Sequence, residues 1–158
     1  MTNLGVTGHQ NIPPIAVDFI RDGVTKIIRN TGNGVVGITA LASGADQLFA
    51  DLVLISKGQL HVVIPCRRYE ETFSNKVDLH KFIDLRNRAD VVEILDFEEP
   101  SEGAFLAAGH RIVELSDLLI AIWDGGPARG KGGTADVVQY ANKLRVDVKV
   151  LWPPGINR

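Results

Sequence analysis

Leu118-Leu119-Ile120-Ala121-Ile122 is the most hydrophobic run in the chain, and Trp123 and a glycine-rich segment follow it directly. A short apolar run bounded by turn residues is typical of a strand buried on both faces of a parallel sheet. From about Thr134 to Lys143 the pattern predicts a helix. A buried strand, a loop and a helix in this order indicate a βα unit of an α/β sheet.

The same alternation of short apolar runs and longer amphipathic segments extends along the chain. Further strands are predicted at 4–7, 35–41, 60–64, 91–95 and 146–151, and further helices at 13–30, 43–57, 75–89 and 101–114. Strands separated by helices pair in parallel, with helices on both faces. We therefore predict a Rossmann-like three-layer α/β fold with a mostly parallel sheet. Residues 1–158 have the length of one domain and are expected to form a single Rossmann-like domain.

Net charge and cysteine content narrow the range of partners and chemistries that the sequence supports. The formal net charge is -2, whereas proteins that bind the phosphate backbone of DNA or RNA usually show a basic excess. Nucleic acid is therefore not expected as a partner. The single cysteine, Cys66, excludes an intramolecular disulfide, and we expect a small buried thiol rather than a nucleophile. No Cys/His set has the spacing of a zinc site, and nothing in the sequence indicates a metal or another cofactor.

The cellular setting is predicted from what the sequence lacks. No apolar run approaches the roughly 20 residues that cross a bilayer. The N-terminal residues have neither the basic start nor the apolar run of a signal peptide. These features predict a cytoplasmic location and no membrane partner.

Ligands of open parallel sheets bind in the crevice beyond the carboxyl ends of the strands. After the strand at 118–122, glycines allow the backbone to approach a ligand, and the first N–H groups of the next helix favour an anion. The candidates in this segment are Trp123, Asp124, Gly125, Gly130, Lys131, Gly132, Gly133 and Thr134. A flexible surface loop with Thr134 as the helix cap is the alternative. The segment 125–131 matches GxxxxGK, but Gly132 replaces the Ser or Thr of a Walker A motif, so an ATPase is not supported.

Other loops contribute candidates at the same edge. Gly8 and His9 follow the first strand, and Ser43, Gly44, Ala45 and Asp46 begin the helix after the second. Small residues at this helix start either admit a phosphate or let the helix pack closely on the sheet, and both explanations can hold. Arg67, after the third strand, and Arg111, on the helix at 101–114, could contact a phosphate, or could form surface ion pairs. Asp46 and Asp136 are the acids placed best for acid–base chemistry.

Three of these segments, in this order, resemble the SLOG superfamily of Rossmann-like nucleotide-binding proteins. They are Gly5-Val6-Thr7-Gly8-His9, Leu41-Ala42-Ser43-Gly44-Ala45-Asp46, and Ile122 to Gly125 with Gly132 to Asp136. The superfamily includes the DNA-processing protein A family and the "Lonely guy" phosphoribohydrolases. The resemblance implies a nucleoside phosphate ligand and a homodimer or higher homo-oligomer. In the phosphoribohydrolase signature PGGxGTxxE the glutamate serves N-glycosidic cleavage, and Val137 stands at its place here.

These observations favour a protein that binds or senses a nucleotide or a nucleotide derivative. An enzyme that cleaves the N-glycosidic bond of a nucleotide, with Asp136 or Asp46 as the acid, is the alternative. A dimeric interaction module without a ligand is the third possibility. Whether the protein is an enzyme is left open by the sequence.

Overall fold

The computed structural model describes residues 1–127 and 133–157. In these residues six strands form one sheet that is parallel throughout, in the order β4-β3-β2-β1-β5-β6. The strands are β1 (Thr2–Gly8), β2 (Val35–Thr39), β3 (Gln59–Ile64), β4 (Val91–Ile94), β5 (Leu118–Ile122) and β6 (Asp147–Leu151). The central strands are apolar on both faces, as in β5, where Leu119 and Ile120 are both fully buried.

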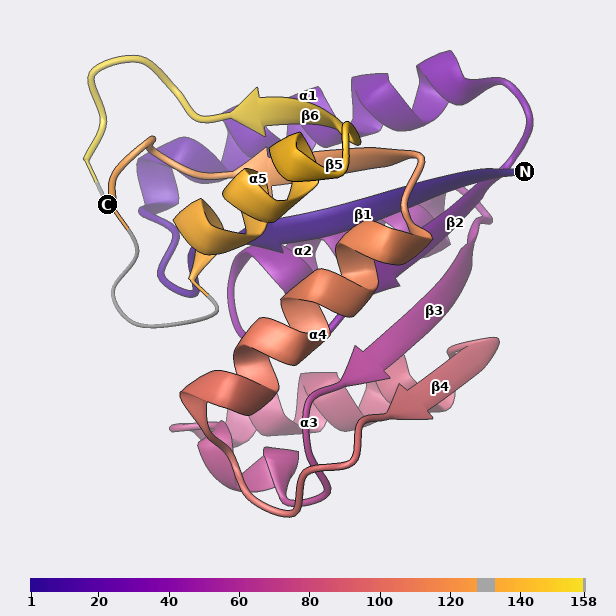
Figure 1. Cartoon of the computed structure of the whole chain (residues 1–158). Helices are drawn as coiled ribbons and strands as arrows, with labels where there is room; N and C mark the ends of the chain where they lie inside the picture. The colour runs from indigo at the N-terminus through magenta and orange to yellow at the C-terminus, as the bar shows by residue number, and fades with distance from the viewer. Residues whose placement is uncertain (128–132, 158) are drawn as a thin grey trace.

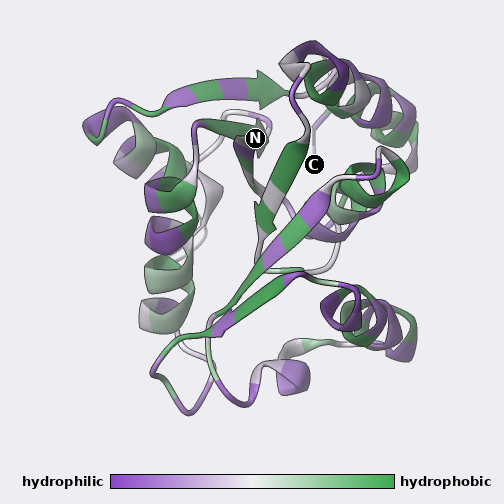
Figure 2. Cartoon of the chain, turned by 90° about the vertical axis from the view of Figure 1, so that its right-hand side faces the viewer, coloured by the Kyte–Doolittle hydropathy of each residue, from purple (hydrophilic) through white to green (hydrophobic). Residues whose placement is uncertain are grey.

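Helices cover both faces of the sheet, which gives three layers (Figures 1 and 2). One face carries α1 (Pro14–Thr31), α2 (Ala45–Ile55) and α3 (Lys76–Asn87), and the other carries α4 (Glu102–Leu115) and α5 (Thr134–Lys143). A short 3-10 helix, η1 (Tyr69–Thr72), follows β3. On α1 the buried residues Ala16, Ile20, Val24 and Ile28 recur every four positions, because one side of an amphipathic helix faces the sheet.

The order of the strands places a crevice beside β1. The chain first adds β2, β3 and β4 on one side of β1, and then returns through α4 to add β5 and β6 on the other. The loops after β1 and β5 therefore leave the sheet toward different helical layers. A parallel sheet opens to ligands at such a switch point, beyond the carboxyl ends of its strands.

The structure confirms the predicted fold class, and each predicted strand and helix is present with shifts of a few residues at its ends. Gly44 precedes α2, which begins at Ala45 and not at Ser43, and Gly133 precedes α5, so that Thr134 is the first helical residue and not the cap. At the start of α4, Ser101 Oγ accepts the Ala104 N–H at 3.0 Å and caps the helix. In the described ranges no helix is both long and apolar enough to cross a membrane.

Candidate functional site

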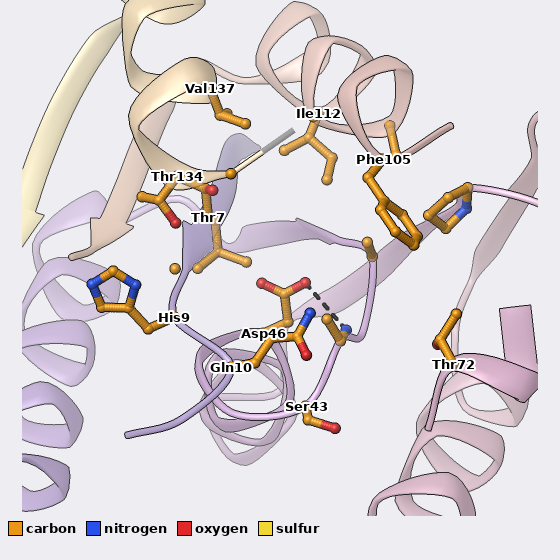
Figure 3. A pocket seen from close by; sticks show the side chains of 18 of the residues that line it. Thr7, His9, Gln10, Ser43, Asp46, Thr72, Phe105, Ile112, Thr134 and Val137 are labelled. Atoms are coloured by element: carbon orange, nitrogen blue, oxygen red, sulfur yellow. Dashed lines mark hydrogen bonds between the residues drawn. The ribbon is translucent and has the colours of Figure 1, made fainter. Parts of the chain in front are cut away.

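A cavity of about 640 Å³ lies at the carboxyl edge of the sheet, between its ends and the α4–α5 layer (Figure 3). This volume falls within the range of about 300–1,000 Å³ that is common for small-molecule sites. Of the predicted site residues, the cavity is lined by Gly8, His9, Ser43, Asp46, Trp123, Gly133 and Thr134. Segments more than 120 residues apart in the sequence thus meet at one site, as the switch point requires.

Asp46 is the buried acid of this cavity. Its side chain comes from the first turn of α2, and the residue is 8% exposed. One carboxylate oxygen, Oδ2, accepts the Ala42 N–H at 3.2 Å. Burial raises the pKa of Asp46 to about 7, although hydrogen bonds from Ala42, Ala40 and Thr39 oppose the shift. Asp46 is therefore poised between its neutral and charged forms near neutral pH.

The small residues before Asp46 serve close packing. Gly44 has φ 81°, and a Cβ at this position would lie 2.2 Å from the carbonyl oxygen of Gln10. The Ala45 N–H donates to the His9 carbonyl at 3.0 Å, so this amide is not available to a ligand. Gly8 makes a similar close approach, because its Cβ would lie 2.5 Å from that of Ala45. Gly44 and Ala45 are not among the residues that line the cavity, and the packing explanation accounts for both.

His9 and the residues after β5 hold two loops together. His9 is 7% exposed, and its Nε2 lies 3.2 Å from Asp124 Oδ1 and 3.2 Å from the Asp124 amide nitrogen. Its ring also meets the Trp152 ring edge-on, with centroids 5.2 Å apart. Asp124 Oδ1 accepts the Gly126 N–H at 2.9 Å, so this predicted ligand residue caps its own loop. The Trp123 indole N–H donates to the Gly126 carbonyl at 2.9 Å, while Trp123 still lines the cavity.

The start of α5 faces the cavity. Gly133, Thr134 and Ala135 all line it, and Thr134 is 8% exposed. The first N–H groups of a helix have no acceptor within the helix. The predicted ligand residues Gly130, Lys131 and Gly132 lie outside the described residues. Gly125 is described, has φ 87°, and is not part of the lining.

One wall of the cavity was not predicted as a site. Phe105, Ala108, Gly109 and Ile112 of α4 line it, and their spacing places them on one side of the helix. This spacing is visible in the sequence, but it is the same pattern that packs a helix onto a sheet. The lining also includes Tyr69, which is buried against Phe73 and Phe82.

Three further predicted candidates also lie outside the cavity lining. Arg67 pairs with Asp96 at 2.7 Å and with Glu98 at 3.5 Å. Arg111 makes two hydrogen bonds to Glu93, at 2.9 and 3.2 Å, and its partner is thus Glu93 on β4. Asp136 is on α5 but does not line the cavity, whereas the neighbouring Val137 does.

The charge of the cavity is acidic in the described ranges. Its lining there contains Asp46 and Glu102 but no lysine or arginine. Across residues 1–127 and 133–157, no cluster of three or more His, Cys, Asp or Glu side chains is arranged to hold a metal ion. The polar side chains of the described lining carry hydroxyls, carboxylates, the Gln10 amide and the rings of His9 and Trp123.

Comparison with known proteins identifies solved structures with a similar fold. No protein-family model matches the chain, and no curated protein sequence does. DNA processing protein A from Helicobacter pylori aligns with 99% of this chain and 67% of its own, with a TM-score of 0.69 and 21% identity. The protein of the same name from Streptococcus pneumoniae aligns with 94% of this chain, with a TM-score of 0.68 and 20% identity. This chain spans only half of that protein.

A third similar structure is the molybdenum cofactor binding protein from Rippkaea orientalis, with a TM-score of 0.59, 16% identity and coverage of 94% of this chain and 75% of that one. At 16% to 21% identity these similarities concern the fold alone. The chain shares the fold of DNA processing protein A, as the resemblance seen in the sequence implied.

The comparison also corrects one expectation. The Helicobacter pylori protein is described by its single-stranded DNA binding mode, so proteins of this fold include ones that bind nucleic acid. Our expectation that nucleic acid is an unlikely partner is wrong. It was based on the net charge of the whole chain, and a net charge does not report how charge is distributed over one surface.

Proposed function

We propose that the cavity binds a nucleotide or a nucleotide derivative, with a phosphate of the ligand at the amino end of α5. The observation that carries this proposal is that the first turn of α5 opens onto a ligand-sized cavity at the switch point of the sheet. Helix starts favour anions, because unpaired N–H groups and the positive end of the helix dipole coincide there.

The distribution of charge supports this orientation of the ligand. Asp46 and Glu102 disfavour a phosphate near the loop after β2 and near the start of α4. Thr134 offers a hydroxyl at the other side of the cavity, beside the N–H groups of α5. The nucleoside part then occupies the remaining volume, which the apolar side chains of Phe105 and Ile112 border on the α4 side.

Binding without hydrolysis is the function that the site supports best. The position of the phosphoribohydrolase glutamate is occupied by Val137, which cannot transfer a proton. Of the two acids considered for catalysis, only Asp46 lines the cavity. Incubation with nucleoside monophosphates, followed by chromatography of the free bases, tests this choice. Base release by the wild type that Asp46→Asn abolishes would establish the hydrolase instead.

Binding is tested by calorimetric titration with adenosine 5′-monophosphate (AMP). Thr134→Val keeps the shape of the side chain and removes the hydroxyl. Because hydrogen bonds to charged groups contribute about 1.5–3 kcal/mol, we expect AMP affinity to fall roughly 10- to 100-fold. Thr31→Val is the matched control, since the Thr31 hydroxyl donates to the Ile28 carbonyl at the far end of α1. Equal affinity of the two variants would contradict the phosphate placement at α5.

Single-stranded DNA is a second candidate ligand, favoured by the fold shared with the Helicobacter pylori protein. The two candidates are separated by competition. Fluorescence anisotropy of a labelled oligothymidine reports DNA binding, and added AMP should displace the DNA if both occupy the cavity. Oligothymidine binding that AMP and Thr134→Val leave unchanged would place the DNA on another surface.

A further inference from the structure

We propose that Asp46 selects the ligand by accepting hydrogen bonds from neutral donors of its nucleoside part, either sugar hydroxyls or a base amine. This inference rests on the proposed nucleotide binding and specifies which part of the ligand lies where. Asp46 and Thr134 begin helices on opposite faces of the sheet, yet both line the same cavity. A ligand that fills the cavity thus meets N–H and hydroxyl donors at α5 and an acceptor at α2.

The position of the Asp46 side chain supports a direct contact. Figure 3 shows its carboxylate directed away from α2, beside Thr7 and Gln10, which also line the cavity. The Ala42 N–H holds Oδ2 and fixes the direction of the carboxyl group. Because a carboxylate oxygen has more than one lone pair, the group keeps acceptor capacity for a ligand.

The chemistry of the lining determines which ligand groups fit beside Asp46. The described lining brings no lysine or arginine to neutralise this acid, and Glu102 adds a second acidic group. An anionic group beside Asp46 is therefore repelled, while a hydroxyl or an amine N–H relieves the cost of burying a charge. The phosphate and the donor groups of a nucleotide are thus directed to different ends of the cavity.

AMP and two analogues serve as probes. In 2′,3′-dideoxyadenosine 5′-monophosphate both sugar hydroxyls are missing, and in inosine 5′-monophosphate the base amine is replaced by a carbonyl. Asp46→Asn keeps the size of the side chain and removes its charge. Asp51→Asn makes the same chemical change on the same helix at a residue that pairs with Lys81 outside the cavity lining.

We expect Asp46→Asn to weaken AMP binding about tenfold or more, and Asp51→Asn to leave it unchanged. The effect of Asp46→Asn should disappear for the analogue that lacks the recognised donor. The analogue that shows no effect thus identifies whether Asp46 contacts the sugar hydroxyls or the base amine. An equal loss for AMP and both analogues would assign Asp46 a purely structural role and overturn the inference, as would full affinity of Asp46→Asn. If Asp46→Asn does not fold, the wild type alone provides the test. Equal affinity of the wild type for AMP and both analogues would also overturn the inference.

A pH profile provides a second readout. Because burial raises the pKa of Asp46 to about 7, AMP affinity of the wild type should increase between pH 6 and 8 relative to Asp46→Asn. The other titratable groups of the described lining are His9, Tyr69 and Glu102, and the AMP phosphate titrates near pH 6. All of these groups are present with the wild type and with Asp46→Asn, so their contributions cancel when the two pH profiles of AMP affinity are compared. Wild-type protein that binds no nucleotide at any pH would instead refute the proposed function itself.

Discussion

The carboxyl group of Asp46 is placed where its charge is disfavoured, which links folding to pH. Burial raises the pKa of this group from 3.8 to about 7 in the folded chain. Between these values the folded state holds a proton that the unfolded state has lost, so stability decreases as pH rises. At about 1.4 kcal/mol per pKa unit, the loss amounts to about 4 kcal/mol and is complete above pH 7.

Urea denaturation at pH 5 and pH 8 measures this contribution. We expect the wild type to lose more free energy of unfolding over this range than Asp46→Asn, which has no charge to bury. Asp51→Asn again serves as the control and should follow the wild type. Parallel pH profiles for the wild type and Asp46→Asn would show that the carboxylate is well solvated in the folded protein.

Individual site residues were predictable to different degrees. Asp46, Ser43, His9 and Thr134 could be assigned to one edge of the sheet, because each directly follows a predicted strand or begins the helix after it. The burial of Asp46 could not be predicted, since it depends on how residues far apart in sequence pack around it. Asp124 was predicted to contact a ligand, and in the structure it accepts the Gly126 N–H of its own loop.

Among the elements, the turn that leads into α2 has the strictest requirement for glycine. Gly44 combines φ 81° and ψ -120° with a Cβ position 2.2 Å from the Gln10 carbonyl oxygen. Gly32, at the end of α1, also has a positive φ of 71°, but nothing lies within 4 Å of its Cβ position. A substitution at Gly32 therefore tests the cost of the backbone conformation alone, whereas a substitution at Gly44 adds the cost of a steric clash.

Alanine substitutions at these two sites should differ strongly. Gly32→Ala is expected to cost about 1 kcal/mol, the usual penalty of the left-handed conformation. Gly44→Ala must also move the loop after β1, and we expect a loss of about 3 kcal/mol or more. Thermal and urea denaturation of both variants measure the difference. Equal losses would show that the loop after β1 moves away at little cost.

Elements with strong patterns were predicted well for physical reasons. Strands such as β5 are buried on both faces and appear as uninterrupted apolar runs, and α1 shows its buried side every four residues. The start of α2 was predicted two residues early, at Ser43, whereas close contact with the Gln10 carbonyl requires glycine directly before Ala45. The cavity wall on α4 was missed because ligand-facing and sheet-facing apolar residues have the same spacing.

On the scale of the whole molecule, salt dependence separates the two candidate ligands. Each phosphate contact with single-stranded DNA contributes about -0.7 to the slope of log affinity against log salt concentration. The affinity for an oligothymidine that contacts several cationic side chains should therefore fall steeply between 50 and 200 mM salt. AMP places one phosphate in a cavity whose described lining has no lysine or arginine, and its affinity should change little. Equally shallow slopes would show that any bound DNA contacts the protein through one nucleotide only.

The return of the chain through α4 also has a consequence for synthesis on the ribosome. When Ile94 has emerged, the four strands β1 to β4 can pair, but β5 and the first turn of α5 do not yet exist. At that stage only one side of the cavity has formed, because the side that α4 and α5 contribute is missing. The full lining of the cavity is therefore present only after translation has passed Val137.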